Sequence, residues 1–185
     1  MSVGLRRTVT IATILLLALS SIADAAPSRR RAKKQEEAAP PPTSVDKRDR
    51  VVNAPGTPYN GRAYWQAAAQ CGGIYFKLGA IHSDAAIRAK VIKPDPAAYA
   101  SLTKDANAAN RSATAFYEAA ERFLIADRKL SREEAVVTYD PVANATGERL
   151  KTVESATNAA KACPELYQIC HGAFPQVCSE RTLPN

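Results

Sequence analysis

Four cysteines are the residues of this 185-residue chain best suited to chemistry: Cys71, Cys163, Cys170 and Cys178. A cysteine can act as a nucleophile, ligate a metal or form a disulfide, and each role needs a different setting. Cys71 lies in the segment AAAQCGGIYFKLGA, beside two glycines and inside an otherwise helical pattern. The sequence has no C-x-x-C pair for thiol–disulfide exchange, which argues against a redox enzyme.

No metal or haem site is predicted from these cysteines. The three C-terminal cysteines could bind zinc with His171, but they are seven and eight residues apart and lack a close C-x₂₋₄-C pair. The pair Cys170-His171 matches the end of a C-x-x-C-H haem motif, yet Tyr167 stands where the first cysteine is required. We therefore expect no cofactor and no metal.

Catalytic motifs of other kinds are also missing. Nucleophile-elbow, zinc-protease, phosphate-loop and EF-hand patterns do not occur in the sequence, and neither His82 nor His171 has familiar catalytic neighbours. The adjacent carboxylates Glu133 and Glu134 open a helix, where the helix dipole favours negative charge. The sequence therefore predicts a non-enzymatic protein, with an enzyme of unfamiliar site as an alternative.

The N-terminus has the layout of a secretory signal peptide over residues 1–25. Arg6 and Arg7 precede an apolar run at 9–19, and Ala25 ends the expected cleavage site. The apolar run is shorter than the roughly 20 residues that a spanning helix needs, and no later segment is longer. We expect an exported protein, periplasmic or secreted, with no transmembrane segment after cleavage. An even number of cysteines then favours two disulfides.

Residues 26–55 are predicted to be a disordered basic and Pro-rich linker that precedes a helical domain at 56–185. Of the net charge of +7, residues 26–50 carry +4, from eight basic and four acidic residues. The segment lacks aromatic residues and is too polar to form a core. Its basic cluster could dock on an anionic envelope surface or could belong to a simple spacer, whereas nucleic acid is not an expected partner. The cluster consists of Arg29, Arg30, Arg31, Lys33 and Lys34.

The fold predicted for the remainder is an all-α antiparallel bundle of three long helices, with short connecting helices and a disulfide-tied C-terminal cap. The second long helix is expected to begin with the Asp95 cap and Pro96 and to run to about residue 129. Small and aromatic residues recur along it at alternating steps of three and four, which predicts a continuous buried seam. The seam comprises Tyr99, Leu102, Ala106, Ala109, Ala113, Phe116, Ala120 and Phe123.

The flanking helices are less sharply defined. The first is expected over 60–81, with a short connecting helix after it. A capping box at Ser131 and Glu134 predicts the next helix start. Pro141 is expected to end that helix and to start a fresh one running toward Cys163.

The disulfide pairing depends on which cysteines face the core. Cys71 shares a helical stripe with Tyr64 and Leu78, and Cys170 lies on the apolar side of a short last helix, so we predict the pairs Cys71–Cys170 and Cys163–Cys178. The alternative is Cys71–Cys163 with Cys170–Cys178. In either case the two glycines after Cys71 would thin the helix so that it can approach the alanine seam.

Aromatic residues outside the seam are candidates for a binding patch: Trp65, Tyr117, Tyr139 and Phe174. The favoured function is an exported, non-enzymatic helical binding module of the bacterial envelope that contacts an envelope protein or an anionic surface. The alternative is an inhibitor or immunity-type protein that blocks an envelope enzyme. It would use a loop near Gly147 or the segment 171–178.

Overall fold

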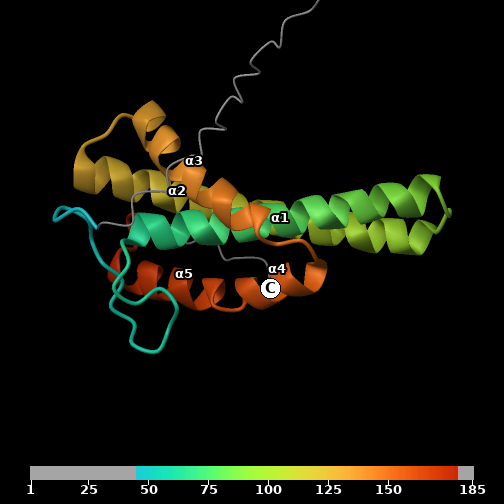
Figure 1. Cartoon of the computed structure of the whole chain (residues 1–185), viewed down its shortest axis with the longest axis horizontal. Helices are drawn as coiled ribbons and strands as arrows, with labels where there is room; N and C mark the ends of the chain where they lie inside the picture. Colours follow the sequence, from blue (N-terminus) through green and yellow to red (C-terminus); the bar gives the residue numbers. More distant parts are fainter. Residues whose placement is uncertain (1–44, 179–185) are drawn as a thin grey trace, which may run out of the picture. The chain divides into compact units, whose positions relative to one another are not determined.

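Helices make up most of the part of the chain that the structure describes (Figure 1). The computed structural model describes residues 45–178, which all lie in one compact unit, 40–185. Within the described residues there is no strand, only a single antiparallel bridge between Val51 and Ala63. The predicted helical class is confirmed to this extent. The helices are α1 (Tyr64–Val91), α2 (Pro96–Arg128), α3 (Arg132–Glu148), α4 (Val153–Ala160) and α5 (Cys163–Ala173).

α1 and α2 lie side by side and antiparallel. Tyr64 at the start of α1 stacks on Phe123 near the end of α2, with 5.0 Å between ring centroids. At the opposite end of the pair, Lys90 lies 5.3 Å from the ring of Tyr99. The two helices therefore run past each other along nearly their whole length.

The start and the seam of α2 match the sequence prediction. Asp95 caps the helix by accepting a hydrogen bond of 2.9 Å from the backbone N–H of Ala98, and Pro96 takes the first helical position. The predicted seam is half-buried at Tyr99 and Leu102 and buried along the rest of its length. Alanines dominate its centre, so the backbones of α1 and α2 can approach closely.

α1 is longer than predicted. The expected break after residue 81 is absent, and the helix continues to Val91. Ser83 and Asp84 favour helix caps in isolation, but Ala86 is buried at 4% exposure. Packing of this last part against α2 keeps it helical.

α3 starts at the predicted capping box but does not end at the predicted residue. Ser131 and Glu134 exchange the two hydrogen bonds of the box. Pro141 lies inside the helix rather than starting a new one. Its missing N–H costs one helical hydrogen bond, while the next two residues, Val142 and Ala143, bury their side chains in the fold. The chain breaks instead between α3 and α4, where Thr152 and Ser155 form a second capping box.

The disulfides follow the alternative pairing. Cys71 bonds to Cys163, and Cys170 bonds to Cys178, so the predicted pairing is wrong. All four cysteines are buried, so core-facing position alone cannot select partners. α5 runs antiparallel to the start of α1, and Cys170 lies about 10 Å further along α5 than Cys163. It therefore lies beyond the reach of Cys71.

Residues before α1 belong to the folded unit. Asp49 is buried and accepts hydrogen bonds from Trp65 Nε1 at 3.1 Å and from Arg128 Nη2 at 2.7 Å. Arg50 Nε donates to Asp127 Oδ1 at 2.7 Å. Asp49 and Arg50 thus contact α1 and α2 although they fall within the segment predicted as linker, because composition does not reveal the partners that charged residues find in the fold.

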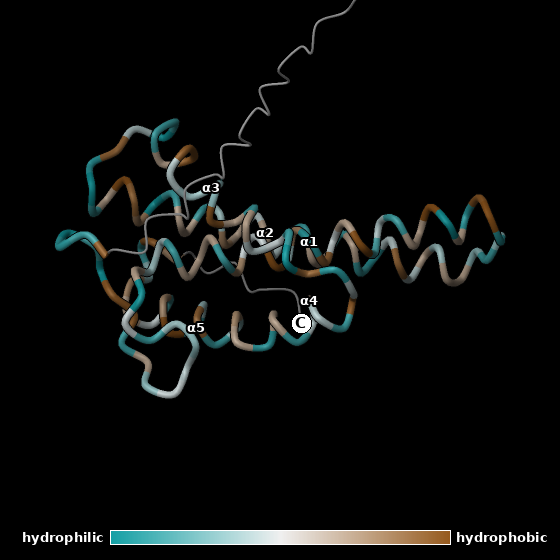
Figure 2. The backbone as a smooth tube through the Cα atoms, viewed as in Figure 1, coloured by the Kyte–Doolittle hydropathy of each residue, from teal (hydrophilic) through white to brown (hydrophobic). Residues whose placement is uncertain are grey.

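The connected ends of α1 and α2 extend beyond the other helices (Figure 1), and hydrophobic residues are conspicuous at their tip (Figure 2). Four residues, Ile92 to Asp95, make the turn between the helices. No helix within residues 45–178 is long and apolar enough to cross a bilayer.

Candidate functional site: a groove between α1 and α3

α1 and α3 cross at an unusually short distance because two glycines face each other. A Cβ added at Gly73 would overlap the carbonyl group of Ala143, and one at Gly147 would lie 3.1 Å from the Gly73 carbonyl oxygen. The neighbouring Gly72 leaves room for the ring of Tyr117 on α2. The two glycines after Cys71 thus serve different neighbours, whereas the sequence prediction assigned both to the alanine seam.

Beside this crossing lies an open groove of about 270 Å³. Four of the residues that line it are glycine or alanine, which are small enough for the close crossing. Phe76 and Tyr117 supply aromatic surface. The groove is lined by Gly73, Phe76, Lys77 and Ala80 of α1, Tyr117 of α2, and Ala143, Asn144, Gly147 and Glu148 of α3.

Phe76 is the most informative residue of the groove. Its side chain is 57% exposed, although a phenylalanine gains more free energy from burial than most residues. Lys77 and Glu148 add one positive and one negative group, and neither forms an ion pair within the described part of the chain. The groove therefore combines an apolar surface with two opposite charges and the Asn144 amide.

One of the four predicted patch residues, Tyr117, lines this groove and contacts a second, Tyr139, which does not line it. Tyr117 stacks on Tyr139 of α3 with 5.6 Å between ring centroids, and both rings are half-buried. Burial raises the pKa of Tyr117 to about 12, with Asp140 and Tyr139 acting in the same direction. Tyr117 is therefore neutral at physiological pH, so Lys77 and Glu148 supply the charge of the groove.

The other two predicted patch residues lie elsewhere. Trp65 is 1% exposed and belongs to the core, where Arg128 covers its ring at 5.1 Å. Phe174 follows α5 and packs edge-on against Tyr64 and Phe123. The four aromatic residues therefore do not form one patch. The sequence prediction failed here because position along a helix does not by itself reveal which aromatic residues face inward.

The remaining predicted surfaces are the two loop segments near Gly147 and Cys178 and the N-terminal basic cluster. Gly147 is buried against α1, and Cys178 is buried and bonded to Cys170, so each of the two segments considered as an inhibitory loop is anchored to the fold at one of these residues. The basic cluster at Arg29, Arg30, Arg31, Lys33 and Lys34 lies outside the described residues.

The cysteines and His171 are engaged in structural contacts, whereas His82 is not hydrogen-bonded through Nδ1 to any residue that the structure describes. The Tyr59 hydroxyl lies 3.1 Å from Cys71 Sγ and 3.3 Å from Cys163 Sγ, and burial raises the pKa of this tyrosine to about 12. His171 Nδ1 lies 2.9 Å from the carbonyl oxygen of Cys178. His82 Nδ1 is buried and has no hydrogen-bond partner within the described residues. In residues 45–178 no three metal-ligating side chains gather at one point.

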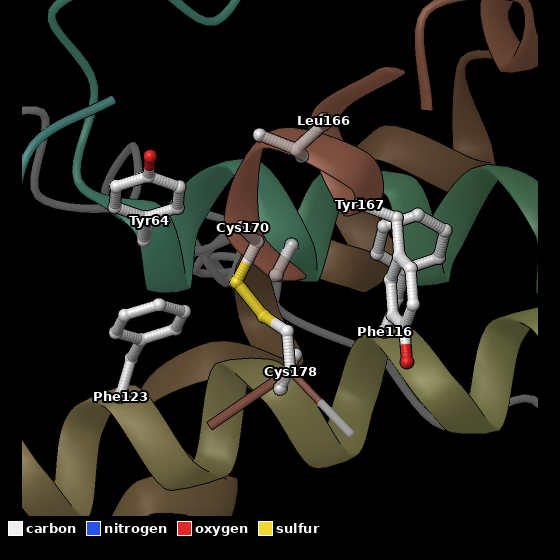
Figure 3. Close-up of a pocket in the computed structure, with 9 residues that line it drawn as sticks. Tyr64, Phe116, Phe123, Leu166, Tyr167, Cys170 and Cys178 are labelled. Carbon is white, nitrogen blue, oxygen red and sulfur yellow. A yellow bond between two sulfur atoms is a disulfide. The ribbon is translucent and has the colours of Figure 1, made fainter. Parts of the chain in front are cut away.

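A second, much smaller space lies beside the Cys170–Cys178 disulfide (Figure 3). It measures about 10 Å³ and is surrounded by apolar surface from Tyr64 and Phe123 on one side and from Phe116 and Tyr167 on the other. A space of this size holds about one water at most, and a water needs polar partners. It is a gap in the packing rather than a ligand site.

The groove was missed by sequence analysis, although one signal for it exists. Phe76 is a large apolar residue that lies off the stripe of Tyr64, Cys71 and Leu78. An off-stripe aromatic beside paired glycines could have indicated an exposed site next to a close helix crossing. Comparison of the chain with protein-family models, curated proteins and solved structures yields no match.

Proposed function

We propose that this chain is an exported, non-enzymatic binding module, periplasmic or secreted, whose α1–α3 groove receives an apolar segment of a protein partner. Two disulfides and the absence of a membrane-spanning helix among the described residues are consistent with an oxidising compartment. The predicted signal peptide at residues 1–25 supplies the route of export.

The observation that carries the proposal is the exposure of Phe76 next to the glycine crossing. Exposed aromatic side chains beside a pre-formed groove are the usual anchors of protein interfaces. Because Gly73 and Ala143 are in backbone contact, the groove keeps its shape without a ligand, which lowers the entropic cost of binding. Lys77 and Glu148 could orient a peptide by pairing with its polar groups.

Site-specific photocrosslinking in the native host tests the proposal. A photoreactive phenylalanine derivative replaces Phe76, and the matched control carries it at Arg111, an exposed position on α2. We expect a defined adduct from position 76 and none from position 111. Equal adducts at both positions would contradict a binding groove.

The captured partner is then purified and titrated against the full exported chain. Phe76→Asp should weaken binding by on the order of tenfold or more, because it removes an aromatic anchor and introduces a charge. Val137→Asp is the control, since Val137 is 74% exposed on α3 and does not line the groove. Equal affinity of the Phe76 variant and the wild type would overturn the proposal.

A further inference from the structure

The tip of the α1–α2 pair exposes three large aliphatic side chains. Ile87, Val91 and Ile92 are 60%, 70% and 76% exposed. Ile87 and Val91 are one turn apart and share one face of α1, while the buried Ala86 faces inward. These three residues, defined here as the apolar tip, lie where the helix pair extends beyond the rest of the fold (Figure 2).

Three basic residues lie next to the apolar tip in the sequence, one turn or more after the exposed Asp84. Arg88, Lys90 and Lys93 fall within residues 87–93, and no acidic residue occurs in that interval. None of the three forms an ion pair within the described residues. Lys90 lies over the ring of Tyr99 at 5.3 Å. The nearby Asp95 is engaged as the helix cap of α2.

This arrangement matches an anionic bilayer surface. Aliphatic side chains partition into the boundary between headgroups and acyl chains, and long basic side chains extend from there to lipid phosphates. A stiff helical pair can bring its end into that boundary while the rest of the fold stays in water. Aliphatic groups offer no stacking platform for nucleic acid bases.

We infer that the apolar tip, with Arg88, Lys90 and Lys93, is a docking site for anionic lipid membranes. The site is separate from the groove between α1 and α3, so it holds or fails independently of the proposed protein partner. It also differs from the basic cluster of residues 29–34, because it contributes apolar contact as well as charge.

Vesicle flotation of the full exported chain tests this inference. Phosphatidylglycerol mixed with phosphatidylcholine is the anionic membrane, and phosphatidylcholine alone is the neutral one. We expect wild-type protein to float with the anionic vesicles and to stay behind with the neutral ones. Equal partition into both would overturn the inference.

Charge removal at the tip is compared with charge removal elsewhere. The triple change Arg88→Gln, Lys90→Gln and Lys93→Gln should lower the anionic partition coefficient by on the order of a hundredfold. The control removes the same charge from three exposed positions away from the tip, Arg111, Lys151 and Lys161, by the same change to glutamine. The basic tail is identical in both proteins, so a loss of equal size in both would overturn the tip as the site.

Removal of the aliphatic side chains tests insertion. Val91→Ser with Ile92→Ser should lower anionic partition by about tenfold. Val137→Ser with Val153→Ser is the matched control, because these valines are also exposed, at 74% and 42%. Unchanged partition of the tip variant would overturn the inference and would direct attention to a protein that covers the tip.

A fluorescent reporter separates tip insertion from tail binding. Trp65, the only tryptophan, is 1% exposed, so its emission should not respond to the membrane. Ile92→Trp places a second tryptophan at the tip, and we expect its emission to shift to the blue with anionic vesicles and to be quenched by brominated lipid. Flotation without shift or quenching would show that the tail alone binds, which overturns the inference.

Discussion

Gly73 of α1 lies against the backbone carbonyl of Ala143 in α3, and no side chain separates the two helices at this point. The contact places the groove, because it brings Gly147 and its neighbours close to α1 while Phe76, three residues after Gly73, remains exposed. A methyl group at position 73 is enough to force the two helices apart.

Gly73→Ala should therefore destabilise the protein by about 1 to 3 kcal/mol through overpacking, despite the higher helix propensity of alanine. Urea unfolding followed by circular dichroism measures the change. Gly172→Ala is the control, because a Cβ there meets no atom within 4 Å. It should raise the free energy of unfolding by about 0.5 to 1 kcal/mol. A neutral or stabilising Gly73→Ala would show that the two helices do not meet as described.

Asp49 should make stability depend on pH. Burial raises the pKa of its carboxyl. Hydrogen bonds from Arg128 and Trp65, together with the Arg128 charge, lower the pKa by a larger amount, so the net pKa lies below that of a free aspartate. A lowered folded-state pKa means that the stabilisation is present above the unfolded pKa and is lost as pH falls through the folded one.

The matching variant is Asp49→Asn. At about pH 7 it should cost on the order of 2 to 3 kcal/mol, because Arg128 loses its ionised partner. The difference from wild type should shrink as pH falls below about 4, the pKa of an unfolded aspartate, and should disappear only below the lowered folded pKa. Asp84→Asn, at an exposed position, is the control and should follow wild type throughout. A difference that stays constant with pH would show that the Asp49 charge does not contribute.

Removal of the two disulfides should have unequal effects. The Cys71–Cys163 bond closes 92 residues and the Cys170–Cys178 bond closes 8. The chain-entropy estimate gives about 4 to 5 kcal/mol for the long loop and about 2 to 3 kcal/mol for the short one. Paired serine substitutions and urea unfolding measure both. Non-reducing peptide mapping with cleavage after Lys161 and Glu165 identifies the bonds directly, and recovery of Cys71 joined to Cys170 would overturn the pairing.

Local signals in the sequence were reliable where the contact spans a few residues. The Asp95 cap, the Ser131–Glu134 box and the buried seam of α2 were all predicted correctly, because helix caps and one-turn neighbours depend on residues three or four apart. Pro141 misled the prediction because only its effect on neighbouring residues was considered. Its local preference for a helix start is outweighed by burial of Val142 and Ala143 in the fold.

The groove and the disulfide pairing could not be predicted in this way. Both depend on which turn of α1 lies opposite α3 and α5, and Cys163 and Cys170 look equally inward-facing from sequence. The seam on α2 predicted that a partner packs there, but not which glycine would face which helix.

The sequence by itself determined that the chain is helical, where α2 and α3 begin, and which side of α2 is buried, since periodicity and capping act within a few residues. Only the tertiary structure decided that Trp65 is core, that Asp49 and Arg50 join the fold, and that Phe76 stands exposed beside Gly73. The physical reason is that these outcomes depend on contacts between segments far apart in the chain. Such contacts are selected by the shape of the whole core rather than by the preferences of neighbouring residues.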